Sequence, residues 1–327
     1  MSETVIVTGG AGYIGSHTCK VLAKAGFTPV TYDSLARGHE WSVRWGPLER
    51  GDVLDRAALA AVFDRYRPVA VVHFAGFIYV GESVKEPLLY YRHNVGGTLA
   101  LLETMQAAGV RHLVFSSSAA VYGIPAQVPI VEDAELRPIN PYGASKHMAE
   151  RLVADAAAAW PLTWTALRYF NAAGADPEGE LGEAHHPEPH LVPRALAAAA
   201  RDLPEFGIFG DDYDTPDGTC IRDYIHVSDL AEAHVAALRY LLAGKPSRPI
   251  NVGTGRGYSV REVVDTVKRV TGRDFACPIG PRRPGDPARL VADAARATEL
   301  LGLVCRYPSL ADIVDHAWAW YQKRKAR

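Results

Sequence analysis

The sequence predicts an α/β protein built on a doubly wound parallel sheet. Short runs rich in Val, Ile, Thr and aromatic residues occur at 4–8, 28–33, 69–75, 112–118 and 163–170. These runs are almost continuously apolar, which is typical of parallel strands covered on both faces. Between them lie segments with helical periodicity that end in glycine, such as 15–26 and 95–109. Strands that alternate with helices favour a parallel sheet with right-handed crossovers.

The regular alternation of strand-like and helical segments ends at about residue 171. Residues 171–190 are rich in Gly, Pro, Glu and His, and they indicate a long irregular connection of the kind that often carries function. A strand at 222–227 leads into a helix that Ser228 is expected to cap, and a strand at 249–255 follows. We therefore expect a first domain over 1–175 and a smaller mixed α/β domain over 176–327, from which some elements return to the first sheet.

The composition argues against several classes of function. The 327 residues carry 35 Lys and Arg against 37 Asp and Glu, so the basic surface of a nucleic-acid-binding protein is not expected. No apolar run reaches the roughly 18–20 residues of a membrane span, and the N-terminal residues lack the basic region of a signal peptide. Four scattered cysteines fit free thiols in a reducing compartment. A soluble cytoplasmic protein with no nucleic-acid or membrane partner is expected.

The first strand-to-helix turn carries a glycine motif, TVIVTGGAGYIGSH, in which Gly9, Gly12 and Gly15 are three residues apart. Glycines at such a turn let the backbone approach a pyrophosphate, which the N-terminus of the helix then stabilises. Asp33 ends the second strand, about 20 residues later, where a carboxylate binds a ribose diol and repels a 2′-phosphate. The pattern predicts a Rossmann-type site for NAD; an ordinary tight turn is the alternative.

Tyr142 and Lys146 are four residues apart in the stretch NPYGASKHMAE. Asn140 is the expected N-cap of a helix and Pro141 its first residue. Residues i and i+4 share a helix face, so the ammonium group is expected to lower the pKa of the phenol from its usual value of about 10. Such a phenol can act as a base near neutral pH. The same spacing also arises by chance on many helices.

The chain resembles the UDP-glucose 4-epimerase family, also called the UDP-galactose 4-epimerases, within the extended short-chain dehydrogenase/reductases. The resemblance runs from residue 4 to roughly residue 320. It rests on the glycine loop, HFAG (73–76), SSSAAVYG (116–123), the Tyr142–Lys146 pair, RYFNAAG (168–174) and RDYIHV (222–227), which stand in the order of that family.

The resemblance implies a reaction in which Tyr142 deprotonates the sugar 4′-hydroxyl while a hydride passes from C4 to NAD and then returns to the opposite face. Lys146 would hold the nicotinamide ribose and, with the positive ring, lower the pKa of Tyr142. Ser118 would hydrogen-bond the same sugar hydroxyl. The implied activity interconverts UDP-galactose and UDP-glucose. Alternatives are a 4-epimerase of another UDP-sugar (N-acetylhexosamine, pentose or uronic acid) and, from a different class, a non-catalytic NAD-binding regulator.

The resemblance also implies which residues line the two sites, with NAD bound by domain 1–175 and the UDP-sugar by domain 176–327. The implied cofactor contacts are Gly9, Gly12, Tyr13, Ile14, Gly15, Asp33, Asp52, Val53, Phe74, Ala75, Gly76, Asn94, Ser116, Tyr142, Lys146 and Tyr169. The implied substrate contacts are Ser118, Tyr142, Asn171, His190, Leu191, Arg222, Arg283, Asp286 and Leu290. For Asp52 a helix-capping role is the alternative. A homodimer is expected through the helices at 95–109 and 145–160.

Several residues of this chain differ from the pattern of the family, and others argue against a dehydratase activity or a metal site. Ile78 stands where the best-known bacterial form has a lysine that helps to hold the cofactor pyrophosphate, and Ala120 stands where many members have a threonine. Related 4,6-dehydratases carry an Asp-Glu pair after the strand-end serine or threonine, whereas this chain has Ala119-Ala120, which disfavours elimination. Leu290 is intermediate between the tyrosine of sugar-restricted members and the small residues that admit N-acetylated sugars. The histidines of EAHHPEPH lack the spacing of a helical metal-binding pair, so no metal site is expected.

Overall fold

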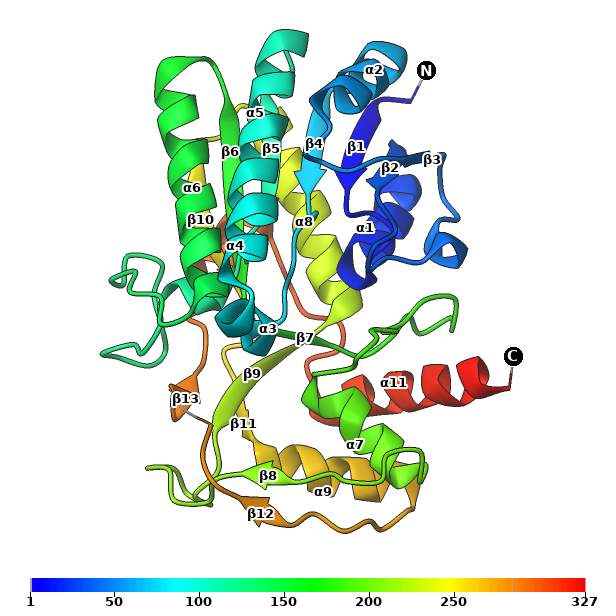
Figure 1. Ribbon diagram of the computed structural model, residues 1–327, viewed down its shortest axis with the longest axis vertical. Coiled ribbons are helices and arrows are strands. Elements are labelled where there is room, and N and C mark those ends of the chain that lie inside the picture. Colours follow the sequence, from blue (N-terminus) through cyan, green and yellow to red (C-terminus); the bar gives the residue numbers. More distant parts are fainter. Residues whose placement is uncertain (1, 284, 327) are drawn as a thin grey trace.

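The computed structural model describes residues 2–283 and 285–326. Its centre is a seven-stranded sheet in the order β10–β6–β5–β4–β1–β2–β3, in which every pairing is parallel (Figure 1). The predicted doubly wound parallel sheet is therefore confirmed. The strands are β1 (Thr4–Thr8), β2 (Thr28–Asp33), β3 (Leu48–Arg50), β4 (Ala70–His73), β5 (His112–Ser116), β6 (Thr163–Tyr169) and β10 (Arg248–Val252).

Two helical layers cover this sheet (Figure 1). One layer contains α2 (Arg56–Tyr66), α5 (Gly97–Ala108) and α6 (Pro141–Ala159). The other contains α1 (Tyr13–Lys24), α8 (Val227–Leu242) and α10 (Ala295–Leu301). Within β1, Val5 and Val7 belong to the apolar cluster of the second layer, while Ile6 between them belongs to that of the first. Successive residues of a strand point to opposite faces, so burial of both faces requires the continuous apolar runs of the sequence.

The second half of the chain forms a smaller mixed unit below the carboxyl edge of the large sheet (Figure 1). Its core is the contact between α7, α9 and α11. Its helices are α7 (Leu191–Ala199), α9 (Val260–Thr271) and α11 (Leu310–Lys325), and its strands are β7 (Asn171–Ala173), β8 (Ile208–Phe209), β9 (Ile221–His226), β11 (Gly257–Ser259), β12 (Ile279–Gly280) and β13 (Arg289–Leu290). The chain also returns to the large sheet after residue 176, because β10 pairs with β6 and α8 packs against α1.

The structure corrects some expected boundaries. Ser228 is not the N-cap of the helix that follows β9: α8 begins at Val227, and the Nδ1 of His226 accepts from the backbone N–H of Ser228 at 3.0 Å. The strand expected at 69–75 ends at His73 and the one expected at 112–118 ends at Ser116, since the chain then turns into loops at the sheet edge. The edge strand β3 was not predicted, because its three residues, LER, carry no apolar pattern.

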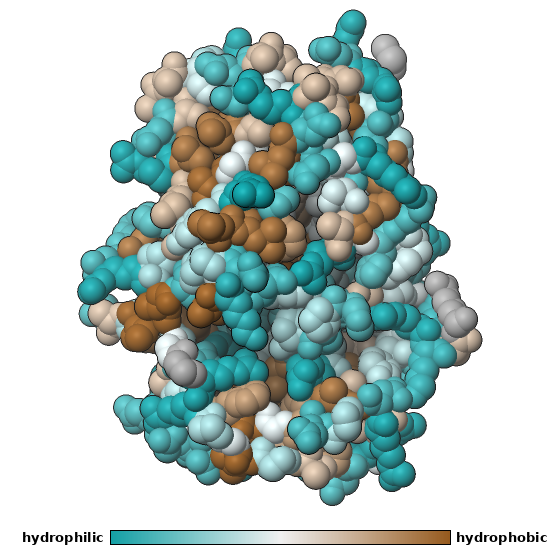
Figure 2. All heavy atoms as spheres, viewed as in Figure 1, coloured by the Kyte–Doolittle hydropathy of each residue, from teal (hydrophilic) through white to brown (hydrophobic). Residues whose placement is uncertain are grey.

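Short helical segments fill the region beside α5 and α6. They are α3 (Val80–Lys85), α4 (Pro87–Tyr90), the π-helical segment η2 (Tyr91–Gly96) and the 3₁₀ turn η3 (Ala119–Val121). A further 3₁₀ turn, η1 (Glu40–Ser42), lies in the connection between β2 and β3. Apolar atoms gather on the outer face over α4, α5 and α6 (Figure 2). Val84, Leu88, Leu99 and Met148 are exposed there, Leu88 to 75%. Among the helices that the structure describes, none is both long enough and apolar enough to cross a bilayer.

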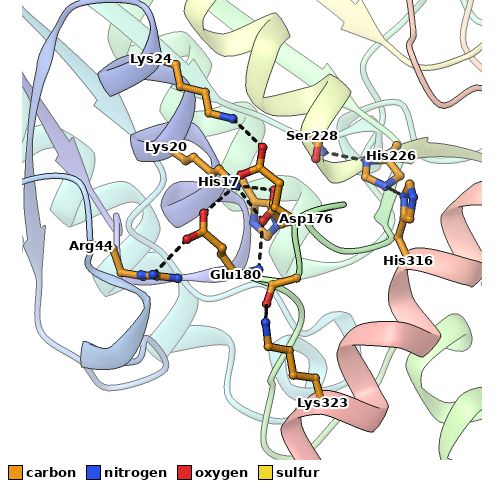
Figure 3. A network of polar contacts seen from close by, with 12 residues as sticks. His17, Lys20, Lys24, Arg44, Asp176, Glu180, His226, Ser228, His316 and Lys323 are labelled. Atoms are coloured by element: carbon orange, nitrogen blue, oxygen red, sulfur yellow. Dashed lines mark hydrogen bonds and ion pairs between the residues drawn. The ribbon is translucent and has the colours of Figure 1, made fainter.

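The connection that follows β7 is fastened to α1 by a buried ion cluster (Figure 3). The Nζ of Lys20 lies 2.8 Å from a carboxylate oxygen of Asp176, 2.7 Å from one of Glu178 and 2.9 Å from one of Glu180. The Lys20 and Asp176 side chains are buried, while those of Glu178 and Glu180 reach solvent. A buried carboxylate without a cation is strongly unfavourable. Lys20 is therefore the anchor between the two halves at this point.

We expect Lys20→Met to lower the free energy of unfolding by about 3–5 kcal/mol, because it leaves the Asp176 carboxylate buried without its cation. The matched control is Lys24→Met on the same helix, where the exposed Lys24 meets Glu178 at 3.3 Å. That exposed pair is expected to contribute less than about 1 kcal/mol. Urea unfolding of both variants and the parent measures the two effects. Equal, small losses in the two variants would show that the cluster does not anchor the connection.

Candidate active site

Three of the predicted catalytic residues meet at the carboxyl end of β5. Asn140 caps α6, because its Oδ1 accepts from the backbone N–H of Gly143 at 2.9 Å, and Pro141 follows as the first helical residue. The predicted start of this helix is therefore confirmed. Tyr142 and Lys146 lie on the buried face of α6 and are 7% and 3% exposed. Ser118, 8% exposed, follows β5, and its Oγ accepts from the N–H of Ala120 at 3.2 Å.

Lys146 is buried without a direct carboxylate partner. Its Nζ donates to the backbone oxygen of Ser116 at 2.8 Å and lies 5.1 Å from the ring centre of Phe115. Burial lowers the pKa of Lys146 to about 8, and the charge of Glu150 only partly opposes this effect. Glu150 itself forms a buried ion pair with Arg168 at 2.6 Å. The ammonium group is thus held at the sheet edge at an electrostatic cost.

The phenol of Tyr142 does not have the lowered pKa that we expected from Lys146. Burial raises the pKa of Tyr142, and only the Ser118 hydroxyl acts in the opposite direction. Lys146 is directed toward the Ser116 carbonyl, so it does not offset the desolvation of the phenol. The expectation that Lys146 lowers the pKa of Tyr142 is therefore wrong. A further positive charge is needed to make this phenol a base near neutral pH.

The glycine loop has the close backbone packing of a dinucleotide cradle. Gly9 adopts a left-handed φ of 72°, and a Cβ on it would lie 2.6 Å from the backbone nitrogen of Ala75. A Cβ on Gly15 would lie 2.3 Å from the Gly9 oxygen. Gly12 is the N-cap of α1 and has no side chain to accept from the first N–H groups of that helix. Those donors suit a pyrophosphate, so the loop fits the predicted cofactor.

Asp33 lies at the end of β2 and shapes the same loop. Its two oxygens accept from the backbone N–H groups of Ala11 at 3.0 Å and Leu35 at 2.8 Å. Burial raises the pKa of Asp33, although both hydrogen bonds oppose this shift. Each carboxylate oxygen keeps a second lone pair for a ribose hydroxyl. Tyr13 donates from its hydroxyl to the Gly174 oxygen at 2.7 Å, so it joins the loop to the chain after β7.

The loop that follows β4 carries more of the predicted cofactor residues. Ala75 donates its N–H to Thr8, and Phe74 stacks on His234 with ring centres 4.6 Å apart. The Oδ1 of Asn94 accepts from the N–H of Phe77 at 2.8 Å, and its Nδ2 donates to Ser145 at 2.9 Å. Asn94 thereby fixes the HFAG loop against α6. A Cβ on Gly76 would lie 2.8 Å from Asn94 Oδ1, which is why glycine is needed in this loop.

The remaining predicted cofactor residues differ in their surroundings. Ser116 and Tyr169 share a hydroxyl hydrogen bond at 2.8 Å on adjacent strands. Ile14 packs against the apolar cluster of α1 and α8, and Val53 is buried. Asp52 accepts from the N–H of Leu54 at 2.9 Å and does not cap α2; the cap is Asp55, which accepts from Ala58. Ile78, in the place of the family lysine, is partly exposed.

The predicted phosphate-binding residues form a separate polar group in the second half. Arg222 on β9 pairs with Asp286, and it also donates to the Ile221 oxygen at 2.8 Å. The guanidinium of Arg283 is exposed and lies over the Phe209 ring, 4.2 Å from its centre. Asn171 donates to the Asp223 oxygen at 3.1 Å, while Leu290 packs against the cluster of Tyr122 and its neighbours. Arg222 and Asp286 are thus brought together, as two halves of one ion pair.

His190 and Leu191 begin α7, but His190 is engaged in its own loop. Its Nδ1 lies 2.7 Å from Glu183 and 3.0 Å from Glu188, and His185 joins the same cluster. Burial alone would lower the pKa of His190, but the carboxylates outweigh it and raise the pKa to about 10. Sequence reasoning singled out the histidines and missed both glutamates. The alternation of Glu and His in GEAHHPEPH was the available signal.

Sequence reasoning also missed Glu150, a carboxylate whose charge raises the pKa of Lys146 against the effect of burial. Glu150 follows Lys146 by four residues and is buried on the same face of α6. Its i+4 spacing and its place opposite a strand carrying Arg168 could have indicated a supporting role. No acidic pair follows Ser118, since η3 contains Ala119 and Ala120. The described residues around the phenol therefore lack the acid and base that an elimination requires.

Comparisons with known proteins agree with this geometry. Residues 5–253 match the model of the NAD dependent epimerase/dehydratase family. The chain is 50% identical to the UDP-glucose 4-epimerase of Rhizobium leguminosarum bv. trifolii, over 98% of both proteins. It superposes on the UDP-glucose 4-epimerase from Brucella ovis in complex with NAD with a TM-score of 0.95 and 52% identity, covering 97% of this chain and 98% of that one.

A third relative is the UDP-Glc/GlcNAc 4-epimerase from Campylobacter jejuni, with a TM-score of 0.86 and 41% identity. The match covers 98% of this chain and all of that one. The identity extends across the whole chain, and the Ser118–Tyr142–Lys146 group lies at a glycine-rich dinucleotide cradle. This chain therefore belongs to the NAD dependent epimerase/dehydratase family, among its UDP-glucose 4-epimerases.

Proposed function

We propose that this protein interconverts UDP-galactose and UDP-glucose by reversible oxidation at C4 of the sugar, with NAD as cofactor. The observation that carries this proposal is the buried group of Ser118, Tyr142 and Lys146 beside the glycine cradle. The chain is also 50% identical to a curated UDP-glucose 4-epimerase along nearly its whole length.

The residues of the first half would hold NAD. The glycine loop and the open N-terminus of α1 suit its pyrophosphate, Asp33 its adenosine ribose, and Lys146 its nicotinamide ribose. Tyr13, Asp52, Val53, Asn94, Ser116 and Tyr169 would complete its surroundings. When bound, NAD supplies a hydride acceptor for C4 and the hydride that later returns to the other face of the sugar.

The chain itself would supply the proton chemistry. Tyr142 would accept the proton of the 4′-hydroxyl during oxidation. It would return the proton to the 4′-oxygen after the keto sugar has rotated, so no net proton is consumed. Ser118 orients that hydroxyl by a hydrogen bond. The bound cofactor would supply the further positive charge that the buried Tyr142 needs to lose its proton. The buried setting of both side chains excludes water from the reacting oxygen.

The second half would hold the UDP part of the substrate. Guanidinium groups bind phosphate through paired hydrogen bonds, so Arg222 and Arg283 are assigned to the diphosphate and Asp286 to ribose hydroxyls. The backbone of His190 and Leu191 is assigned to the uracil, and Asn171 to the nucleotide-sugar. Leu290 is assigned to the sugar pocket. Its intermediate size makes conversion of N-acetylated UDP-sugars a second candidate activity, and the C. jejuni relative is named a UDP-Glc/GlcNAc 4-epimerase.

We further propose a homodimer in the cytoplasm. The exposed apolar side chains on α3, α4, α5 and α6 form the surface that a second copy would cover (Figure 2). Contiguous apolar surface of this kind favours association. The free thiols of all four cysteines support a reducing compartment.

Purified protein with NAD is expected to convert UDP-galactose to UDP-glucose until a fixed ratio is reached, with no added reductant. Tyr142→Phe should slow this conversion by about 10²–10⁴-fold, because the phenol is the proton acceptor. Proton NMR of the sugar follows both reactions. The matched control is Tyr66→Phe, which removes a hydroxyl on α2 that donates to Glu49 at 2.7 Å and should leave the rate unchanged.

The outcomes separate the alternatives. If UDP-galactose is untouched while NAD is bound, UDP-N-acetylglucosamine, UDP-pentoses and UDP-uronic acids are tested next. If none of them is converted and Tyr142→Phe leaves NAD binding unchanged, the protein is a non-catalytic NAD-binding regulator.

Lys146→Met is expected to stabilise the cofactor-free protein at pH 7 while it abolishes turnover. The pKa of about 8 in the folded state lies below the unfolded value of about 10.4, so the charged lysine opposes folding below pH 8. The difference corresponds to about 3 kcal/mol at most, reduced by the lost hydrogen bond to Ser116. This cost fades as the pH rises from about 8 to about 10. Thermal unfolding across that range should therefore show a stabilised variant at pH 7 and little gain at pH 10.

Leu99→Glu combined with Met148→Glu is expected to convert a dimer into a monomer, because both charges would be buried at the proposed interface. Light scattering after size-exclusion chromatography measures the mass at several concentrations. The control Val304→Glu changes a residue that is 81% exposed elsewhere and should leave the mass unaltered. A parent protein with a monomer mass at every concentration would overturn the dimer.

A further inference from the structure

We propose that Glu183, His185, Glu188 and His190 bind one divalent transition metal, best zinc, in the connection between the two halves. Sequence reasoning expected no metal because the histidine spacing is not helical. The loop structure instead brings together two imidazoles and two carboxylates within eight residues. The inference concerns metal binding and does not depend on the proposed enzymatic activity.

The four side chains converge on one point. The Nδ1 of His190 lies 2.7 Å from a Glu183 oxygen and 3.0 Å from a Glu188 oxygen. The Nδ1 of His185 lies 2.9 Å from Glu183 and 3.7 Å from Glu188. One ligand atom from each residue lies within 4.8 Å of all the others. Such spacings need only small side-chain adjustments to place all four atoms about 2.0–2.2 Å from a central ion.

The charge and the chemistry of the donors fit a transition metal. The Glu183 side chain is 7% exposed, and among the residues described neither it nor the Glu188 side chain pairs with a lysine or arginine. Two carboxylates balance one divalent cation, and the metal would take the place of the protons on the two imidazoles. Two nitrogen and two oxygen donors suit tetrahedral zinc, whereas calcium and magnesium prefer oxygen ligands only.

A second acidic cluster has a lysine ammonium at its centre, which leaves the Glu and His cluster as the metal site. Asp176, Glu178 and Glu180 also lie close enough to share an ion. The ammonium of Lys20 already occupies the centre of that group, at 2.7–2.9 Å from all three. The Glu and His cluster has no such internal cation other than its own imidazoles. A metal is therefore assigned to the Glu and His cluster alone.

The place of the cluster indicates a structural role for the ion. The His185 ring lies edge-on to Tyr13, with centres 6.2 Å apart, and to Tyr79, with centres 5.9 Å apart. His190 is the N-cap residue of α7, and the oxygen of the neighbouring His186 lies 3.4 Å from Arg37. A metal with four protein ligands would thus fix the connection between the cofactor loop and the first helix of the second half.

The test measures zinc binding to the full-length protein in the absence of substrate. Protein stripped with a chelator is dialysed against micromolar zinc chloride, and bound metal is measured by elemental mass spectrometry. One zinc ion per chain is expected. His185→Gln combined with Glu188→Gln should weaken binding by at least about 100-fold, because removal of two ligands exceeds the 10–100-fold effect of losing an outer-shell partner. The control His186→Gln changes the exposed neighbour and should keep full binding.

A second measurement guards against a variant that fails to fold. Cobalt bound to the unaltered protein should show d–d absorption without a thiolate-to-cobalt charge-transfer band, since no cysteine belongs to the cluster. No bound zinc in the unaltered protein would overturn the proposal. So would zinc binding that the double variant retains, or a charge-transfer band that assigns the metal to cysteine.

Discussion

The constraint on which this protein depends is that all seven strands of its large sheet run in one direction. Parallel strands end at the same edge, so the loops that follow β1, β2, β4, β5 and β6 leave the sheet side by side. Both faces must be covered by helices, which keeps the strands apolar and confines polar side chains to this edge. The glycine cradle, Asp33, Asn94, Ser118 and the start of α6 are neighbours for that reason, although more than 130 residues separate the first from the last.

Burial of Lys146 and Tyr142 at that edge shifts their pKa values, and burial of the charged lysine lowers the stability of the fold. Lys146 has lost water without gaining a direct carboxylate partner, and its pKa falls to about 8. Burial raises the pKa of Tyr142, which therefore keeps its proton. Burial therefore sets the protonation of both side chains. A bound positive charge would favour the phenolate and would find Lys146 and Tyr142 already held in place by Asn140, Ser116 and the packing of α6.

The two halves share the apolar core in which α1 packs against α8, and polar contacts add to it after β7. Lys20 joins α1 to three carboxylates of the connection (Figure 3). Tyr13 donates to the Gly174 oxygen a few residues earlier. The Glu and His cluster follows and leads into α7. Ionic contacts of this kind demand a defined geometry, because a buried carboxylate that loses its partner is costly. Arg222, assigned to the UDP-sugar, lies on β9, which pairs with β7 and leads directly into α8.

The sequence by itself determined the parallel sheet, the glycine turn, Asp33 at the end of β2 and the capped start of α6 with Tyr142 and Lys146. Each of these follows from local patterns: apolar runs, a turn that only glycine allows, and the fixed geometry of a helix cap. Tertiary structure alone decided the pKa of Tyr142, the partnership of Arg222 with Asp286, the supporting position of Glu150, and the convergence of Glu183 with His185, Glu188 and His190. These depend on burial and on contacts between segments distant along the chain or folded within an irregular loop. No local pattern encodes how much water a side chain loses, and that loss sets the chemistry of the site.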